Sequence, residues 1–97
     1  MNLINYNFSE IKPDNTIFAL VCFEGPDRYS LAGGLGVRVA ELSEALAQAG
    51  FETHLFFVGD PTLPKHGQHE SGYHLWRCCQ ELSKQYPAGV YQGDKVI

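Results

Sequence analysis

A glycine cluster stands immediately before the strongest helical pattern of the chain, in the run LAGGLGVRVAELSEALAQAG at residues 31–50. The backbone N–H groups at the start of a helix, together with the positive end of the helix dipole, favour an anion such as a phosphate. Glycine lacks a Cβ and lets such an anion come close to the backbone. Gly33, Gly34 and Gly36 are therefore candidate phosphate-binding residues. The alternative interpretation is a strand-to-helix turn that tolerates glycine and binds nothing.

Two common nucleotide-binding motifs do not match this loop. A Walker loop needs Gly-Lys followed by Ser or Thr, and no such sequence follows the glycines. A nicotinamide dinucleotide site needs GxGxxG, and Val39 holds the position of the third glycine after Gly34 and Gly36. Asp60, at the end of the next apolar run, is the one residue that suits a ribose-binding acid. A nicotinamide-binding domain therefore stays open as an alternative.

The loop that precedes the glycines carries polar side chains at the end of an apolar run. In open parallel sheets, ligands bind beyond the carboxyl ends of the strands. Glu24, Asp27 and Arg28 are expected there, as contacts to an acceptor molecule in a cleft or as ordinary surface turn residues.

Histidines raise the question of a metal site. His66, His69 and Glu70 form the order H-x-x-H-E, which matches neither HExxH nor HxxEH. We interpret this segment as a solvated polar loop and expect no metal. His54 and His74 stand in or beside apolar runs, and we expect structural roles for both.

The composition excludes several classes of protein. A net charge of −4 argues against nucleic acid or an anionic membrane as a partner, and 44% hydrophobic residues argue against disorder. The N-terminus lacks a signal-peptide pattern, and no apolar run approaches the roughly 20 residues that span a bilayer. Three cysteines without a CxxC pair indicate reduced, inert thiols in a cytoplasmic protein, with Cys22 in the core and Cys78 and Cys79 adjacent.

Periodicity predicts the elements that position the loop. Residues 1–15 are expected to be an arm, and the apolar run within residues 16–23 predicts a strand at 17–23, covered on both faces. A helix is predicted at 35–49, with Gly50 as a left-handed stop and Phe51 following in a Schellman motif. The side chains expected to face the sheet are Leu35, Val39, Leu42, Leu46 and Ala49.

A second apolar run predicts a strand at 54–58, so that strand, helix and strand form a βαβ unit with two adjacent parallel strands. Residues 60–72 are expected to be a polar connection. Residues 73–86 are ambiguous, with a strand at 73–76 and then a helix that ends before Pro87.

The run FEGPDRYSLAGGLGVRVAELSEALAQAGFETHLFFVGDP resembles the opening of the N-terminal domain of GT-B glycosyltransferases, in particular the glycogen/starch-synthase-like and family-four retaining enzymes. The segment GYHLWRCCQELSKQYPAGVY is similar to a part of bacterial members, and the resemblance covers residues 16–93. It implies a Rossmann-like α/β fold, with residues 16–97 as a partial N-terminal domain. Glycogen and starch synthases have a lysine two positions before the first glycine, and Leu31 in that position favours a more general glycosyltransferase.

The resemblance implies that Gly33 and Gly34, and more weakly Gly36, face the diphosphate of a nucleotide-sugar donor. It implies neither a metal nor another cofactor. The second domain, which holds most of the donor site in this family, is not part of the 97 residues. We therefore expect one wall of a cleft, without catalysis by itself and with a tendency to self-associate. The remaining alternative is an α/β domain that binds a partner and catalyses nothing.

Overall fold

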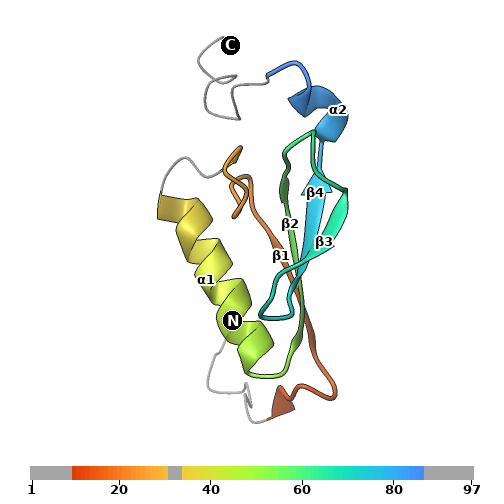
Figure 1. Cartoon of the computed structure of the whole chain (residues 1–97). Helices are drawn as coiled ribbons and strands as arrows, with labels where there is room; N and C mark the ends of the chain where they lie inside the picture. The colour runs from red at the N-terminus through yellow and green to blue at the C-terminus, as the bar shows by residue number, and fades with distance from the viewer. Residues whose placement is uncertain (1–9, 31–33, 87–97) are drawn as a thin grey trace, which may run out of the picture.

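The computed structural model describes residues 10–30 and 34–86, which form a four-stranded sheet and two helices (Figure 1). The first three elements are β1 at Ile17–Val21, α1 at Gly34–Gln48 and β2 at Glu52–Val58. The remaining three are β3 at His66–Gln68, β4 at His74–Cys78 and α2 at Gln80–Ser83. Residues 1–9 of the predicted arm and residues 87–97 lie outside the described part of the chain. The fold class is α/β, as the sequence predicts.

The strands lie in the order β1-β2-β4-β3. β1 pairs with β2 in parallel, and β2 pairs with β4 in parallel, so the predicted adjacent parallel strands with a helix between them are confirmed. The prediction of a plain connection at residues 60–72 is wrong, because β3 forms there and pairs with β4 in antiparallel orientation. A tight turn at Gly72, with φ of 110°, reverses the chain between these two strands, so the sheet is mixed.

The end of α1 is the predicted Schellman motif. Gly50 has φ of 95°, its N–H donates to the carbonyl of Ala47 at 2.9 Å, and the N–H of Phe51 donates to the carbonyl of Leu46 at 3.1 Å. These two bonds satisfy carbonyls that the last helical turn leaves without partners. Gly50 therefore stops the helix and turns the chain into β2.

The core lies between α1 and one face of the sheet. Leu55 and Phe57 of β2 alternate with more exposed residues, as do the side chains of β4, and with Tyr73 and Leu75 they form the buried cluster. Burial of large apolar side chains such as these contributes about 1.5–3 kcal/mol each. The partly buried side chains packed against this cluster are Leu20, Cys22, Val39 and Ala47.

The face of α1 that turns to the sheet differs from the predicted one. Gly36 and Ser43 are buried, whereas Leu35 and Leu42 are 53% and 52% exposed. The helix is thus rotated about its own axis from the predicted orientation by the angle of one residue, about 100°. Of the residues predicted to face the sheet, only Val39 packs against the buried cluster. Small residues at the contact let the helix approach the strands closely, and the Ser43 hydroxyl is satisfied by the carbonyl of Val39 at 2.7 Å.

The opposite face of the sheet has no covering helix among the described residues (Figure 1). Ile17 and Val21 of β1 are 63% and 84% exposed, and Phe23, just after the strand, is 61% exposed. The prediction of a first strand covered on both faces is therefore not met by residues 10–30 and 34–86. β1 has the apolar composition of a buried strand but lies at one edge of the sheet.

Candidate functional site

Glu24 lies just after the end of β1 and reaches the start of α1. Its side chain is 5% exposed, and Oε1 accepts the N–H of Gly36 at 3.1 Å. N–H groups in the first helical turn have no partner within the helix, and a carboxylate there is also favoured by the helix dipole. Glu24 therefore fixes the start of α1 beside the end of β1. Its negative charge occupies part of the position that the sequence offers to a phosphate.

The three candidate glycines have different surroundings. Gly33 lies outside the described residues, and Gly36 is buried with its N–H bonded to Glu24. Gly34 is the first residue of α1 and is exposed, and its φ lies outside the left-handed region. A Cβ at Gly34 would meet no atom within 4 Å. Among the described residues, neither backbone conformation nor packing requires glycine there.

Asp27 is held in a buried ion pair with Arg77. Its Oδ2 accepts from Nε at 2.7 Å, its Oδ1 accepts from the second guanidinium nitrogen at 3.0 Å, and both side chains are less than 10% exposed. The backbone N–H of Asp60 also donates to Oδ2, at 3.4 Å. The Arg77 guanidinium donates in addition to the carbonyl of Pro64 at 2.8 Å. Asp27 thus joins the loops that follow β1 and β2 to the end of β4, and this role occupies both of its carboxylate oxygens.

Arg28 and Asp60 flank this ion pair. Arg28 is exposed, so its guanidinium is available at the surface. Oδ1 of Asp60 accepts both the backbone N–H and the hydroxyl of Thr62, at 2.8 and 2.7 Å, and these bonds hold the pKa of Asp60 below its usual value. A ribose hydroxyl that approached Asp60 would find its Oδ1 already bonded to Thr62.

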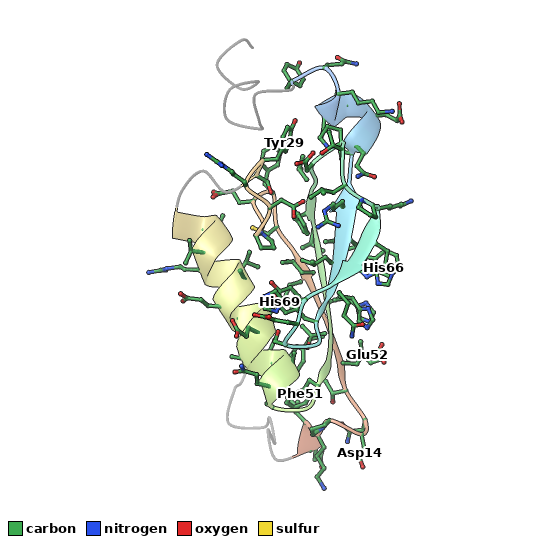
Figure 2. All side chains as sticks on the ribbon, in the orientation of Figure 1. Asp14, Tyr29, Phe51, Glu52, His66 and His69 are labelled. Atoms are coloured by element: carbon green, nitrogen blue, oxygen red, sulfur yellow. The ribbon has the colours of Figure 1, made fainter. Side chains whose placement is uncertain are left out.

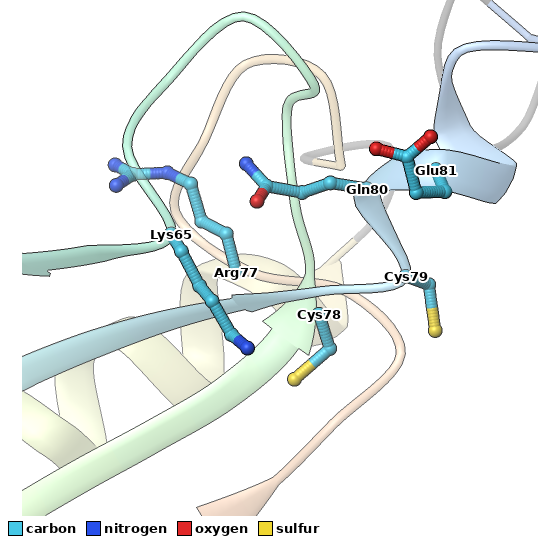
Figure 3. A pocket seen from close by; sticks show the side chains of 6 residues that line it. All are labelled: Lys65, Arg77, Cys78, Cys79, Gln80 and Glu81. Carbon is cyan, nitrogen blue, oxygen red and sulfur yellow. The ribbon is translucent and has the colours of Figure 1, made fainter.

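A groove of about 470 Å³ opens at the end of β4, where the strand passes into α2 (Figure 3). The side chain of Gln80 is held in place in this groove, because its Nε2 donates to the carbonyls of Asp60 and Leu63 at 3.0 and 2.7 Å. The exposed Lys65 brings a positive charge to its rim. The lining residues are Lys65, Arg77, Cys78, Cys79, Gln80 and Glu81.

Histidines gather on the open face of the sheet. Nε2 of His66 lies 2.9 Å from Nδ1 of His74, and the ring of His74 stacks on His54 with centroids 4.6 Å apart. Nδ1 of His54 accepts the indole N–H of Trp76 at 2.9 Å, and its Nε2 lies 2.8 Å from a carboxylate oxygen of Glu52. His54 is therefore the tautomer that carries its proton on Nε2.

The residues considered as metal ligands do not converge. His66 lies in β3 on the open face, whereas His69 lies between the sheet and α1, stacked on Tyr73 and bonded to the hydroxyl of Ser71 at 2.7 Å (Figure 2). Within residues 10–30 and 34–86, no group of three or more His, Cys, Asp or Glu side chains is arranged to hold a metal ion. The prediction of a solvated loop is wrong for His66, which lies in β3.

Acidification is expected to destabilise the fold through His74. Burial lowers the pKa of His74 below 6.5, and the charges of His54 and His66 lower it further, against an opposing contribution from Glu52. Between the folded and the unfolded pKa the unfolded chain binds more protons, so the free energy of unfolding falls as the pH falls through this window. Urea denaturation at pH values between about 7 and 5 measures the slope. His74→Gln should flatten this slope, and an unchanged slope in the His74 variant would contradict the assignment.

Sequence reasoning missed Arg77 as the residue that organises this end of the sheet. The available signal was its place in β4, where Leu75 and Arg77 occupy the buried positions of an alternating strand. A charged residue at a buried strand position indicates a buried partner of opposite charge. That partner is Asp27, which lies 50 residues away in the sequence. Spacing along the chain could therefore not identify it.

Comparison with known proteins adds no relative: no family model, no curated protein and no solved structure matches the chain. In the part of the chain that the structure describes, neither helix has the length and apolar character needed to cross a membrane.

Proposed function

We propose that this chain forms one wall of the donor cleft of a cytoplasmic, two-domain GT-B glycosyltransferase, which transfers a sugar from a nucleotide-sugar to an acceptor. By itself the chain holds no complete active site and transfers no sugar. The observation that supports this proposal best is the exposed start of α1 at Gly34, where a Cβ would meet no atom of the described residues. A glycine that the fold does not require is explained if a ligand backbone or phosphate must pass close to it.

The topology supports a Rossmann-like origin. The parallel strands follow the chain in one direction, β1 to β2 to β4, which leaves the outer edge of β1 unpaired in the described residues. In doubly wound sheets the ligand lies where the strand order reverses, and that reversal would fall beside β1. The loop of Glu24 follows the carboxyl end of β1, and Glu24 bonds to the start of α1. The exposed apolar face of β1 is also the surface that a second layer of such a domain would cover.

Glu24 narrows the proposed position of the donor. Its carboxylate already accepts the Gly36 N–H and would repel a diphosphate on the same group. We therefore place the diphosphate at Gly33 and Gly34 and exclude Gly36 from direct contact. A single helix start contributes only about 0.3–1 kcal/mol for each favourable charge contact, which is less than a tenfold gain in affinity.

NMR titration of backbone amides tests this assignment in the chain as it is. UDP-glucose or ADP-glucose should shift the amide signals near Gly34 with a dissociation constant of about 1 mM or weaker, whereas uridine or adenosine should not. Gly34→Val should abolish the shifts because its branched side chain fills the open space. Glu24→Gln should strengthen them because the repelling charge is removed. Shifts that persist in Gly34→Val, or that the nucleosides also produce, would contradict the proposed diphosphate position.

A second candidate function is partner binding without catalysis, with self-association as its simplest form. It is favoured by the exposed apolar side chains of Ile17, Val21 and Phe23 on the open face. Failure of every nucleotide-sugar to shift the amides at Gly34 would favour this candidate. The nicotinamide-binding alternative has less support, because Val39 replaces the third glycine of the motif and Oδ1 of Asp60 is already bonded to Thr62.

A further inference from the structure

We propose that Cys78 and Cys79 form a dithiol site that binds trivalent arsenicals and chemically similar thiophilic species through both sulfur atoms. The site is independent of the proposed glycosyltransferase function. It is formed by the last residue of β4 and the residue before α2, whereas the proposed donor position is at the start of α1.

The backbone places the two adjacent side chains on the same side. In a regular strand, successive side chains point to opposite faces, so Cys78 and Cys79 would be separated by the sheet. β4 ends at Cys78, and Cys79 has φ of 58° and ψ of 28°, a left-handed conformation that is uncommon outside glycine. This conformation breaks the alternation, and Figure 3 shows both sulfur atoms on the same side of the chain.

Both thiols are reduced and accessible. Cys79 is exposed and Cys78 is partly buried, and both are free cysteines. The Cys78 thiol donates a weak bond to the carbonyl of Trp76 at 3.6 Å, which a stronger ligand can displace. Both residues line the groove beside Lys65 and Gln80 and also a second, more apolar groove of about 260 Å³ that reaches Phe23 and Val58. An aryl or alkyl group on the arsenic can occupy this apolar groove.

The reaction is a condensation without a change of oxidation state. An arsonous acid, R–As(OH)₂, exchanges its two As–O bonds for two As–S bonds, and each thiol proton leaves with a hydroxide as water. Arsenic remains trivalent and the sulfurs are not oxidised. Because the second As–S bond forms within one molecule, its effective concentration is far above that of a free thiol. Two thiols on one side of the chain are therefore required for tight binding.

Cys22 provides a matched control. It lines the more apolar groove together with Cys78 and Cys79, but it packs against the buried cluster of Leu55 and Phe57 that α1 covers. Cys22 follows β1 directly, and in the sheet β2 separates β1 from β4. We therefore expect Cys22 to take no part in the site.

The experiment titrates the 97-residue chain with phenylarsine oxide, which hydrates to an arsonous acid, in the presence of an excess of a monothiol. Native alkylation with iodoacetamide followed by peptide mass spectrometry identifies the protected cysteines. One equivalent should protect Cys78 and Cys79 together and leave the alkylation of Cys22 unchanged. Cys78→Ala or Cys79→Ala should weaken binding about a hundredfold, and Cys22→Ala should have no effect.

Cys79→Asn keeps a residue that tolerates the left-handed conformation, so it separates loss of the thiol from loss of the backbone geometry; circular dichroism confirms that each variant is folded. It should lose binding as Cys79→Ala does. Protection of a single cysteine, equal weakening by Cys22→Ala, or full affinity in Cys79→Asn would overturn the proposal.

Discussion

Asp27→Ala is expected to lower the free energy of unfolding by about 3–5 kcal/mol, because it leaves the Arg77 guanidinium buried without its partner. The two side chains share bonds of 2.7 and 3.0 Å and are almost completely shielded from water. For a domain of ordinary stability, about 5–15 kcal/mol, this is a large part of the total. Chemical denaturation followed by circular dichroism measures the change.

Two control variants distinguish the effect of an unpaired buried charge on stability from the effect of lost contacts. The double variant Asp27→Leu, Arg77→Met replaces the pair by apolar side chains and should recover most of the stability, because no charge is then left unpaired. Lys84→Ala removes the exposed ion pair of Lys84 and Glu81 and should change stability by less than about 1 kcal/mol. An Asp27→Ala effect no larger than that of Lys84→Ala would show that the buried pair contributes nothing particular.

Gly59→Ala is expected to lower the free energy of unfolding by about 1–3 kcal/mol, because the added methyl group overpacks the contact with β4. A Cβ at Gly59 would lie 2.2 Å from the Cβ of Arg77 and 2.7 Å from its Cα, and the backbone of β4 cannot yield to it easily. Gly25→Ala should have a similar effect, because its Cβ would lie 2.2 Å from the Phe57 ring. Thermal or urea denaturation measures both changes.

Gly34→Ala is the matched control for these two substitutions. A Cβ at Gly34 meets no atom within 4 Å, and alanine is the better helix former, so stability should be unchanged or raised by up to about 1 kcal/mol. Equal destabilisation by Gly34→Ala and Gly59→Ala would mean that the effect does not come from packing. The comparison also separates two kinds of glycine among the described residues: Gly25 and Gly59, where a Cβ would clash, and Gly34, where it would meet no described atom.

The elements whose signals lie within a few residues could be predicted from the sequence. The helix stop at Gly50 and the bonds of Phe51 and Gly50 to the last turn depend only on local backbone geometry, and they are found as predicted. The parallel pairing of β1 and β2 followed from two apolar runs joined by one helix, because a helical connection returns the second strand in the same direction.

Only the tertiary structure decided which surfaces and partners these elements use. The apolar spacing pointed to Leu35 and Leu42, but the contact with the sheet selected Gly36 and Ser43, because close approach of a helix to strands depends on the shape of both surfaces. The pairing of Asp27 with Arg77 unites residues 50 positions apart. Such contacts are set by packing free energy summed over distant segments, and no local spacing encodes them.

The candidate site shows the same division. The sequence identified the glycine-rich helix start and the polar loop before it, because glycine and helix-end chemistry are local properties. It did not reveal that the Glu24 carboxylate would bond to the Gly36 N–H, that a Cβ at Gly34 would meet no described atom, or that Cys79 would adopt a left-handed backbone conformation. Each of these depends on the path of the backbone at the ends of β1 and β4, and the folded sheet fixes that path.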